Sequence, residues 1–320
     1  MQQQTMALQK SIQPPTVHLD ANHPGFCDQE YKKRRNHIAS LTTKYQGTIA
    51  SIPLVQYTKQ EHAVWSQVVS KLVKKSQDNA YQHHLDGLRR LQPDPGRVPQ
   101  LRTLSKQIMK TTGFRMAPVA GLVEPKVFLQ ALGDGVFLST QYIRHSSQPG
   151  FTPEPDIIHE IIGHAPQLIN PVIAQITREI GKAAQHCDDK ELVQLERLYW
   201  FTIEYGLCKE NGVVKAYGAR NLSSFNDIQR CLSTKVAHRP FDIRQIIQTP
   251  YDPTQPQPVL FVVESFEEAL QEIREFLSSL AIFKKPSTSR VRYEAESKAR
   301  YQNKLRSTAR EKKTTKDSPL

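Results

Sequence analysis

The spacing of apolar residues along the chain predicts several amphipathic helices. An early stretch repeats apolar side chains at i, i+4 and i+8, which predicts one buried helix face made of Val64, Trp65, Val68, Val69, Leu72 and Val73. Asn170 followed by Pro171 is typical of a helix start, because Asn caps the first turn and proline fits into it. A further helix is predicted over 190–205, with Gly206 ending it.

Shorter patterns predict strands and set the domain organisation. The Asn211-Gly212 pair is typical of a tight turn, with a strand over 213–217 after it, and an aliphatic run over 259–264 predicts a buried strand. Ser265 and Glu268 match a capping box that opens a last helix. No internal repeat or clear linker interrupts this part of the chain. We therefore predict one mainly α domain with short β-strands and hairpins.

Charge is concentrated near the C-terminus. The chain has 320 residues and a formal net charge of +12, of which residues 284–320 carry +8, from twelve Lys or Arg and four Asp or Glu. We expect a disordered polar segment over 1–27, a catalytic domain over 28–283 and a flexible basic tail over 284–320. A solvated tail is the simplest interpretation, and non-specific attraction to nucleic acid or anionic lipid is a secondary one.

Cysteine use and the first residues bear on location. The four cysteines show no CxxC spacing, and the polar start of the chain lacks the apolar stretch of a signal peptide. The longest apolar run, Val259 to Val263, is too short to cross a membrane. We expect a cytoplasmic protein with reduced thiols and no membrane partner.

Two histidines in an apolar stretch give the clearest sign of chemistry. His159 and His164 stand five residues apart, not four as in HExxH zinc proteases. Five residues on a straight helix turn through about 140°, so the rings would not share a face unless Gly163 or Pro166 distorts the helix. Core histidines hydrogen-bonded to carboxylates are an alternative with at least equal weight at this point.

A third candidate ligand shifts the balance toward a metal. Glu204 lies within a strongly apolar predicted helix, where a carboxylate is costly unless it is paired or binds a metal. Two imidazoles and one carboxylate suit non-haem Fe(II) with open coordination positions. No cysteine lies close to the histidine pair, which argues against structural zinc.

Several longer motifs resemble one known family. The chain is similar to the pterin-dependent aromatic amino acid hydroxylases over about residues 28–283, and closest to the phenylalanine 4-hydroxylase type. The segments that carry the resemblance, in order, are GFRMAPVAG from Gly113, TQYIRH from Thr140, PDIIHEIIGH from Pro155, YWFTIEYGLC from Tyr199 and KAYG from Lys215. The resemblance implies the catalytic domain fold of that family.

The resemblance also assigns expected roles to residues of this chain. It implies that His159, His164 and Glu204 bind iron, that Arg144 holds the substrate carboxylate, and that Asp156 supports Arg144 or a ligand histidine. It places Glu160 beside the pterin, whose ring would contact Phe128 and the segment from Val119 to Val123, including Gly121. Trp200 would form a wall of the pocket for the aromatic ring, Ser223 and Ser224 a substrate-side loop, and Tyr251 part of a mobile active-site loop.

Some positions differ from the family pattern. Leu138 stands where animal members have a histidine, Tyr205 replaces the usual Phe, and Arg220-Asn221 replace a Gly-Leu pair before the serines. Pro253 changes a loop that influences which ring is accepted. The regulatory and oligomerisation segments of animal enzymes are not evident, so we expect a monomer or weak dimer.

The expected function is therefore a monooxygenase that uses Fe(2+), a tetrahydropterin and O2. Its expected small-molecule substrate is an aromatic amino acid, with phenylalanine converted to tyrosine as the leading reaction. Tryptophan or tyrosine hydroxylation, or broad specificity, is the alternative within the enzyme class; Trp200 favours phenylalanine or tyrosine. Outside that class stand a metal protein that does not hydroxylate and a basic-tail binder of nucleic acid or membrane; we expect no specific nucleic-acid partner.

Overall fold

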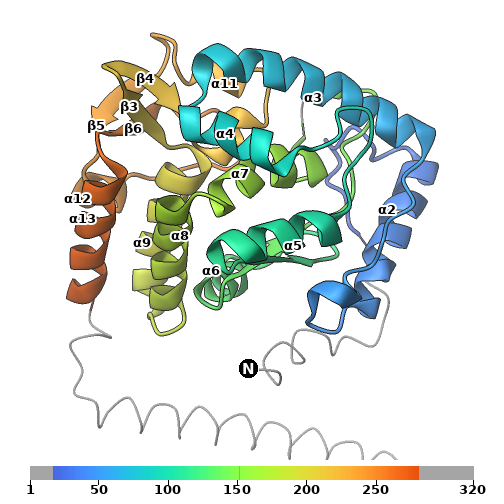
Figure 1. The fold of residues 1–320 in the computed structure, drawn as a ribbon, viewed down its shortest axis with the longest axis horizontal. Coiled ribbons are helices and arrows are strands. Elements are labelled where there is room, and N and C mark those ends of the chain that lie inside the picture. The colour runs from blue at the N-terminus through green and yellow to red at the C-terminus, as the bar shows by residue number, and fades with distance from the viewer. Residues whose placement is uncertain (1–16, 151, 281–320) are drawn as a thin grey trace, which may run out of the picture. The chain divides into compact units, whose positions relative to one another are not determined.

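Helices make up most of the computed structural model, which describes residues 17–150 and 152–280. The strands labelled β3 to β6 lie together at one edge of the molecule (Figure 1). Residues 17–277 with that gap form one compact unit. The predicted mainly α domain with short strands is confirmed. The helices are α2 (Gln29–Leu41), α3 (Lys59–Asn79), α4 (Gln82–Leu91), α5 (Leu101–Thr112), α6 (Pro125–Gly133), α7 (Ala165–Leu168), α8 (Pro171–Ala184), α9 (Asp189–Tyr199), α10 (Ala219–Leu222), α11 (Asp227–Arg230), α12 (Ile243–Ile246) and α13 (Phe266–Ser279).

Two π-helical segments and two 3-10 turns interrupt this pattern. The π-helical segments are η3 (His159–His164) and η4 (Trp200–Glu204), and the 3-10 turns are η1 (Thr42–Lys44) and η2 (Ile49–Ser51). The helix predicted over 190–205 is α-helical only as far as Tyr199 and continues as η4. Its π-helical end was not foreseen, because apolar periodicity does not distinguish these two backbone geometries over five residues.

The strands form two separate sheets. In the first, β1 (Arg115–Pro118) pairs in parallel with β2 (Val136–Ser139), with Arg115 opposite Val136. The second has the order β4-β3-β6-β5, where β3 (Leu207–Glu210) and β4 (Val213–Ala216) form an antiparallel hairpin. Both β3 and β5 (Ala237–Pro240) run parallel to β6 (Val259–Val263). The predicted turn joins the hairpin, and its Asn211 and Gly212 have positive φ values of 51° and 80°.

Caps and apolar faces explain where the main helices lie. The buried positions of α3 include Val64, Trp65, Val68, Val69 and Leu72, as the spacing predicts. The prediction was wrong for Val73, which is 37% exposed because it lies at the edge of that face. The Asn170 side chain accepts hydrogen bonds from the first turn of α8, which packs against α6. The Ser265 hydroxyl accepts from the Glu268 N–H at the start of α13. Burial of these faces, at roughly 25 cal/mol per Å² of apolar area, stabilises the frame that holds the active-site segments.

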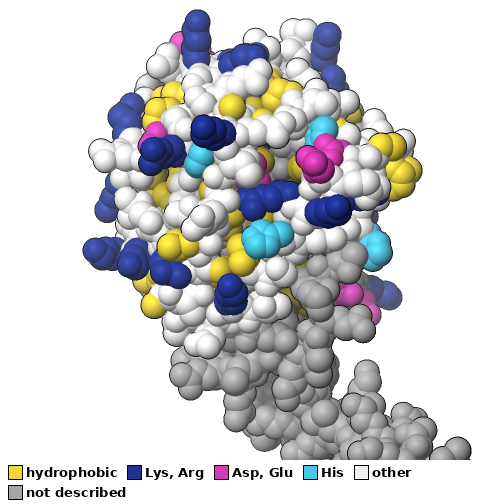
Figure 2. Space-filling view, turned by 90° about the vertical axis from the view of Figure 1, so that its right-hand side faces the viewer, with side chains coloured by type: hydrophobic (Ala, Val, Ile, Leu, Met, Phe, Trp, Pro, Cys, Tyr) yellow, Lys and Arg dark blue, Asp and Glu magenta, His cyan; other side chains and the backbone are white. Residues whose placement is uncertain are grey.

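The described surface gives little support for binding to nucleic acid or anionic lipid. Figure 2 shows Lys and Arg side chains spread over one face of the molecule among other side chains, without a single basic patch in the described part of that face. No helix among residues 17–150 and 152–280 is long and apolar enough to span a bilayer. The predicted tail over 284–320 and most of the segment over 1–27 lie outside the described residues.

Candidate metal centre and its surroundings

π-Helical turns bring the predicted metal ligands onto one side of the chain. In η3 the Ala165 N–H donates to the Glu160 carbonyl, a bond that spans five residues instead of four. Residues five apart therefore lie on nearly the same face, which removes the conflict that a straight α-helix would create for His159 and His164. Glu204, at the end of η4, faces the same point.

The three side chains form a tight cluster. The two Nε2 atoms of His159 and His164 are 3.0 Å apart, and the Glu204 carboxylate oxygens lie 3.1 Å from the His164 Nε2 and 3.5 Å from the His159 Nε2. All three ligand atoms lie within 4.8 Å of one another. Donors bound at about 2.1 Å and at right angles to each other stand about 3.0 Å apart. The cluster therefore has the spacing of three adjacent metal ligands.

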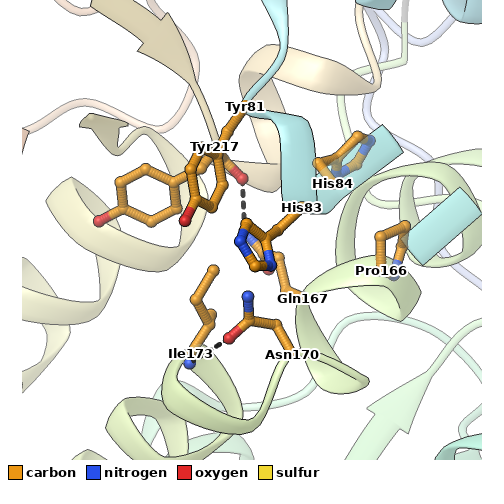
Figure 3. A pocket seen from close by; sticks show the side chains of 8 residues that line it. All are labelled: Tyr81, His83, His84, Pro166, Gln167, Asn170, Ile173 and Tyr217. Carbon is orange, nitrogen blue, oxygen red and sulfur yellow. Dashed lines mark hydrogen bonds between the residues drawn. The ribbon is translucent and has the colours of Figure 1, made fainter. Parts of the chain in front are cut away.

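The outer nitrogen of His164 has a partner that determines which nitrogen carries the proton. The Gln167 amide nitrogen donates to the carbonyls of Ile203 and Tyr217, at 2.8 and 2.9 Å, so its oxygen is the atom that faces the His164 Nδ1 at 3.1 Å. That oxygen can only accept, and Nδ1 must donate. The His164 Nε2 is left with its lone pair directed at the other ligands, as metal binding requires. Figure 3 shows Gln167 and its bond to Tyr217 from the side of a small pocket that Gln167 also lines.

His159 is oriented in the same way by Ser223. The Ser223 Oγ lies 2.8 Å from the His159 Nδ1, and its own hydroxyl donates to the Arg220 carbonyl at 3.4 Å. The serine oxygen thus accepts from Nδ1, which again leaves Nε2 as the inward atom. Ser224 has a structural contact instead, because its Oγ accepts from the Asp227 N–H at 3.3 Å.

Burial and mutual charge determine the protonation of the cluster. Burial lowers the pKa of His159 to about 3. Burial acts to raise the pKa of Glu204, but the charges of His164 and His159 outweigh it and lower that pKa to about 2. For His164 burial acts downward, and the Glu204 carboxylate outweighs it, so the pKa lies above its ordinary value. A bound cation would replace the proton that His164 otherwise takes, so these donors fit a divalent metal.

Glu160 lies next to the cluster in a different environment. Its carboxylate accepts from both the N–H and the hydroxyl of Thr140 at 3.0 Å, and burial raises its pKa to about 7. The Tyr199 hydroxyl is buried without a hydrogen-bond partner among the described residues, and both Glu160 and Glu204 act on its pKa. A polar group bound here would supply the missing partner.

Arg144 and Asp156 form a buried ion pair near the ligands. The guanidinium donates through Nε and Nη2 to both carboxylate oxygens, at 2.9 and 2.8 Å, and Asp156 also accepts from the backbone N–H groups of Arg144 and His159. Arg144 and Asp156 are 3% and 0% exposed. The pair fixes the plane of the guanidinium, whose Nη1 has only a long 3.4 Å contact to the Pro149 carbonyl. Asp156 also connects the pair to the first ligand, His159.

An aromatic wall stands beside Glu204. The Trp200 ring stacks on Tyr251 with centroids 4.5 Å apart and lies 5.1 Å from Tyr205. Glu204 is the most exposed ligand, at 12% of its side chain against 4% for His159 and 2% for His164. The cluster therefore opens toward solvent on the side of this wall.

The residues expected to hold the pterin lie on a separate segment. Gly121 and Val123 are half-buried in the loop between β1 and α6, where Leu122 is 74% exposed. Phe128, on α6, contacts Phe137 and Tyr199 edge to face with centroids 5.5 Å apart. An open loop with an exposed apolar side chain, next to the unpartnered Tyr199 hydroxyl, fits a flat heterocycle with polar edges.

Some supporting residues were not found in the sequence. Gln167 could have been noticed as a polar residue in an apolar run three positions after His164. Nothing in the sequence pointed to the buried Arg35, which pairs with Glu154 at 3.1 Å and lies over the Tyr142 ring at 3.2 Å. Arg35 thus contacts the segment that carries Arg144 and Asp156 near both of its ends.

A buried site of two imidazoles and one carboxylate, set in a helical domain, is typical of proteins that bind non-haem iron. The chain belongs to the biopterin-dependent aromatic amino acid hydroxylase family, whose sequence profile matches residues 4–315. The predicted family and fold are thereby confirmed.

The chain is similar both to curated proteins by sequence and to solved structures by fold. Tyrosine 3-monooxygenase of Bos taurus is 42% identical over 267 residues, which is 82% of this chain and 54% of that protein, and Protein henna of Drosophila melanogaster is 39% identical over 281 residues. The chain spans about half the length of the curated relatives it matches. Phenylalanine hydroxylase of Chromobacterium violaceum, solved with iron(III) and 7,8-dihydrobiopterin, has a TM-score of 0.66 and 33% identity over 70% of this chain and 82% of that one.

Proposed function

We propose that this chain is a non-haem Fe(II), tetrahydropterin-dependent monooxygenase that hydroxylates the ring of an aromatic amino acid. The observation that carries the proposal is the cluster of His159, His164 and Glu204, with both Nε2 lone pairs directed inward by Gln167 and Ser223. Iron and the pterin would supply the activation of O2. The side chains around the cluster would position the substrate amino acid and the pterin.

The substrate amino acid would be held at two points. Arg144, with its guanidinium plane fixed by Asp156, is suited to a two-pronged ion pair with the α-carboxylate. The aromatic side chain would lie against Trp200, with Tyr251 stacked behind that ring and Ser223 and Ser224 on the adjacent loop. This arrangement sets the ring beside Glu204, where the cluster is open, and excludes water from it.

The pterin would lie on the side of the cluster away from the substrate ring. An apolar surface would be offered by Gly121, Val123 and Phe128. Glu160 would offer a carboxylate whose pKa of about 7 lets it donate a proton to a ring nitrogen or accept one from it. The Tyr199 hydroxyl is available to the same group.

Phenylalanine, giving tyrosine, is the substrate proposed first. Trp200 supports it, as does the similarity to bacterial phenylalanine hydroxylases. Tyrosine is the second candidate, because the curated relatives at about 40% identity include tyrosine 3-monooxygenases. Tryptophan hydroxylation and broad specificity are further alternatives, and the assay described next distinguishes them. We also propose, from the sequence, a cytoplasmic location and a monomer or weak dimer.

The test is anaerobic loading with Fe(II), then aerobic reaction with a tetrahydropterin and phenylalanine, tyrosine or tryptophan in turn. We expect a product heavier by one oxygen atom, and its loss in His159→Ala. Pterin oxidation without a hydroxylated amino acid would contradict the proposed substrate class. Iron binding without any reaction would favour a metal protein that does not hydroxylate. Salt-sensitive binding to nucleic acid or vesicles, lost on removal of residues 284–320, would favour the basic-tail binder.

A further inference from the structure

The end of strand β2 lies against the segments proposed to hold the pterin. The Phe137 ring, within the strand, contacts Phe128 of α6 edge to face, with centroids 5.5 Å apart. The carbonyl of Ser139, the last residue of the strand, accepts from the Val119 N–H at 2.9 Å, where the loop before α6 begins. The residue that follows β2 therefore lies close to both segments.

That residue, Thr140, holds one oxygen of the Glu160 carboxylate with two donors. Its backbone N–H and its hydroxyl oxygen each lie 3.0 Å from the Glu160 Oε1. The hydroxyl has a single hydrogen, and its other possible acceptor, the Pro155 carbonyl, is uncharged and farther away at 3.3 Å. Thr140 and Glu160 are 3% and 4% exposed, so water has little access to either bond.

The two bonds restrict the rotation of the carboxylate and direct it. Both donors meet Oε1, which leaves the other oxygen, Oε2, outside this contact. Leu138, two residues before Thr140, supplies no hydrogen-bonding side chain at the position where animal members of the family have a histidine. Polar contacts to a pterin in this chain therefore depend more on Glu160, and on the carboxylate being held in one orientation.

We propose that Thr140 is a positioning residue, which fixes the Glu160 carboxylate for contact with the pterin. This inference rests on the proposed function and concerns how its cofactor is held. A carboxylate that is already fixed loses less conformational freedom when a ligand binds to it. Thr140 acts in this way through Glu160 and not by touching the pterin.

Replacing the Thr140 hydroxyl by a methyl group tests the role directly. Thr140→Val keeps the shape of the side chain and the backbone N–H but removes one of the two bonds. We expect the Fe(II)-loaded variant, without O2, to bind 7,8-dihydrobiopterin about tenfold more weakly by calorimetry. In turnover, KM for the tetrahydropterin should rise by a similar factor, while KM for the amino acid stays within about twofold.

Two further variants separate this effect from a general loss of stability. Thr140→Ser keeps the hydroxyl and should bind dihydrobiopterin within about twofold of the unaltered protein. Thr177→Val is the matched control, because the equally buried Thr177 hydroxyl donates to the Ile173 carbonyl at 2.9 Å within α8. It should leave dihydrobiopterin binding unchanged.

A double variant shows whether Thr140 acts through Glu160. In a Glu160→Ala background there is no carboxylate to position, so Thr140→Val should weaken dihydrobiopterin binding by no more than about a further twofold. A further tenfold loss in that background would mean that the hydroxyl contacts the pterin itself, which would overturn the positioning role.

Failure of this inference differs from failure of the proposed function. Unchanged dihydrobiopterin binding in Thr140→Val, or in Thr140→Ala if the valine variant does not fold, overturns the inference. If binding responds as expected but no amino acid is hydroxylated in the mass assay, the proposed function falls and the role of Thr140 stands. No dihydrobiopterin binding by the unaltered protein would overturn both.

Discussion

The floor and the wall of the proposed active site are built differently. On the floor, His159, His164 and Glu204 are buried, and the outer nitrogen of each histidine has a fixed partner. On the wall, Trp200 and Tyr251 are half-buried and rest on ring contacts, and the Trp200 Nε1 has no partner among the described residues. The geometry of the proposed metal ligands is thus determined by several bonds at once, whereas the proposed recognition of the substrate ring depends on side chains that can change without disturbing those bonds.

The largest effect should come from removing the negative charge of Glu204, one of the three side chains that form the floor. Glu204→Gln keeps the shape of the side chain but leaves the metal with two neutral ligands. We expect iron affinity and turnover each to fall by about 1000-fold, since losing one member of a buried charge pair costs about 4 kcal/mol. Metal analysis after dialysis and the hydroxylation assay measure both. Glu264→Gln, at an exposed pair with Lys209, is the control, and retention of iron in Glu204→Gln would contradict the ligand assignment.

A smaller effect should come from removing a side chain that orients one of the floor histidines. Gln167→Leu removes the acceptor that orients His164, and we expect iron to bind about 10- to 100-fold more weakly, while turnover per bound iron changes little. Competition with a chelator measures the affinity. Gln130→Leu loses a comparable bond, to the Ala184 carbonyl, away from the cluster and should leave the affinity as it is. Equal losses in both variants would mean a general loss of stability.

A third buried histidine sharpens the contrast, because it lacks the partners that the floor histidines have. Both ring nitrogens of His84 are unpartnered among the described residues, and burial lowers its pKa to about 3. Below pH 6.5 the unfolded chain binds a proton there and the folded chain does not, so stability falls as the pH falls toward 3. Between pH 7.5 and 5 we expect a loss of about 2 kcal/mol in the free energy of unfolding.

Urea unfolding at these two pH values measures that loss. His84→Leu should lack it, while the contributions of the other histidines remain in both proteins and cancel in the difference. An identical pH dependence in the variant and the unaltered protein would show that the His84 ring gains partners in solution.

The smallest effect should come from the wall. Trp200→Phe leaves more room beside Tyr251, so we expect kcat/KM for tryptophan to rise about 3- to 10-fold relative to phenylalanine, with iron content unchanged. Product analysis with the two amino acids in competition gives the ratio in one reaction. A loss of iron in this variant would show that the wall also supports the floor.

Local patterns predicted much of the frame but little of the bonding around the cluster. The face of α3, the start of α8 and the β3–β4 turn follow from spacing and capping within a few residues. The ligands came from unusual polar residues in apolar runs and from the family resemblance. The Gln167 bonds to Ile203 and Tyr217, and the bond between His159 and Ser223, join residues 36 to 64 positions apart, which no local pattern contains.

The two π-helical segments also bear on how such a centre could arise. One extra residue in an α-helix rotates everything after it by about 100°, and a π-helical turn absorbs that residue without breaking the helix. In η3 this change places His164 beside His159, and η4 ends at Glu204. Single-residue insertions in two helices are thus a short evolutionary route from an ordinary helical core to a metal centre, with no new loop required.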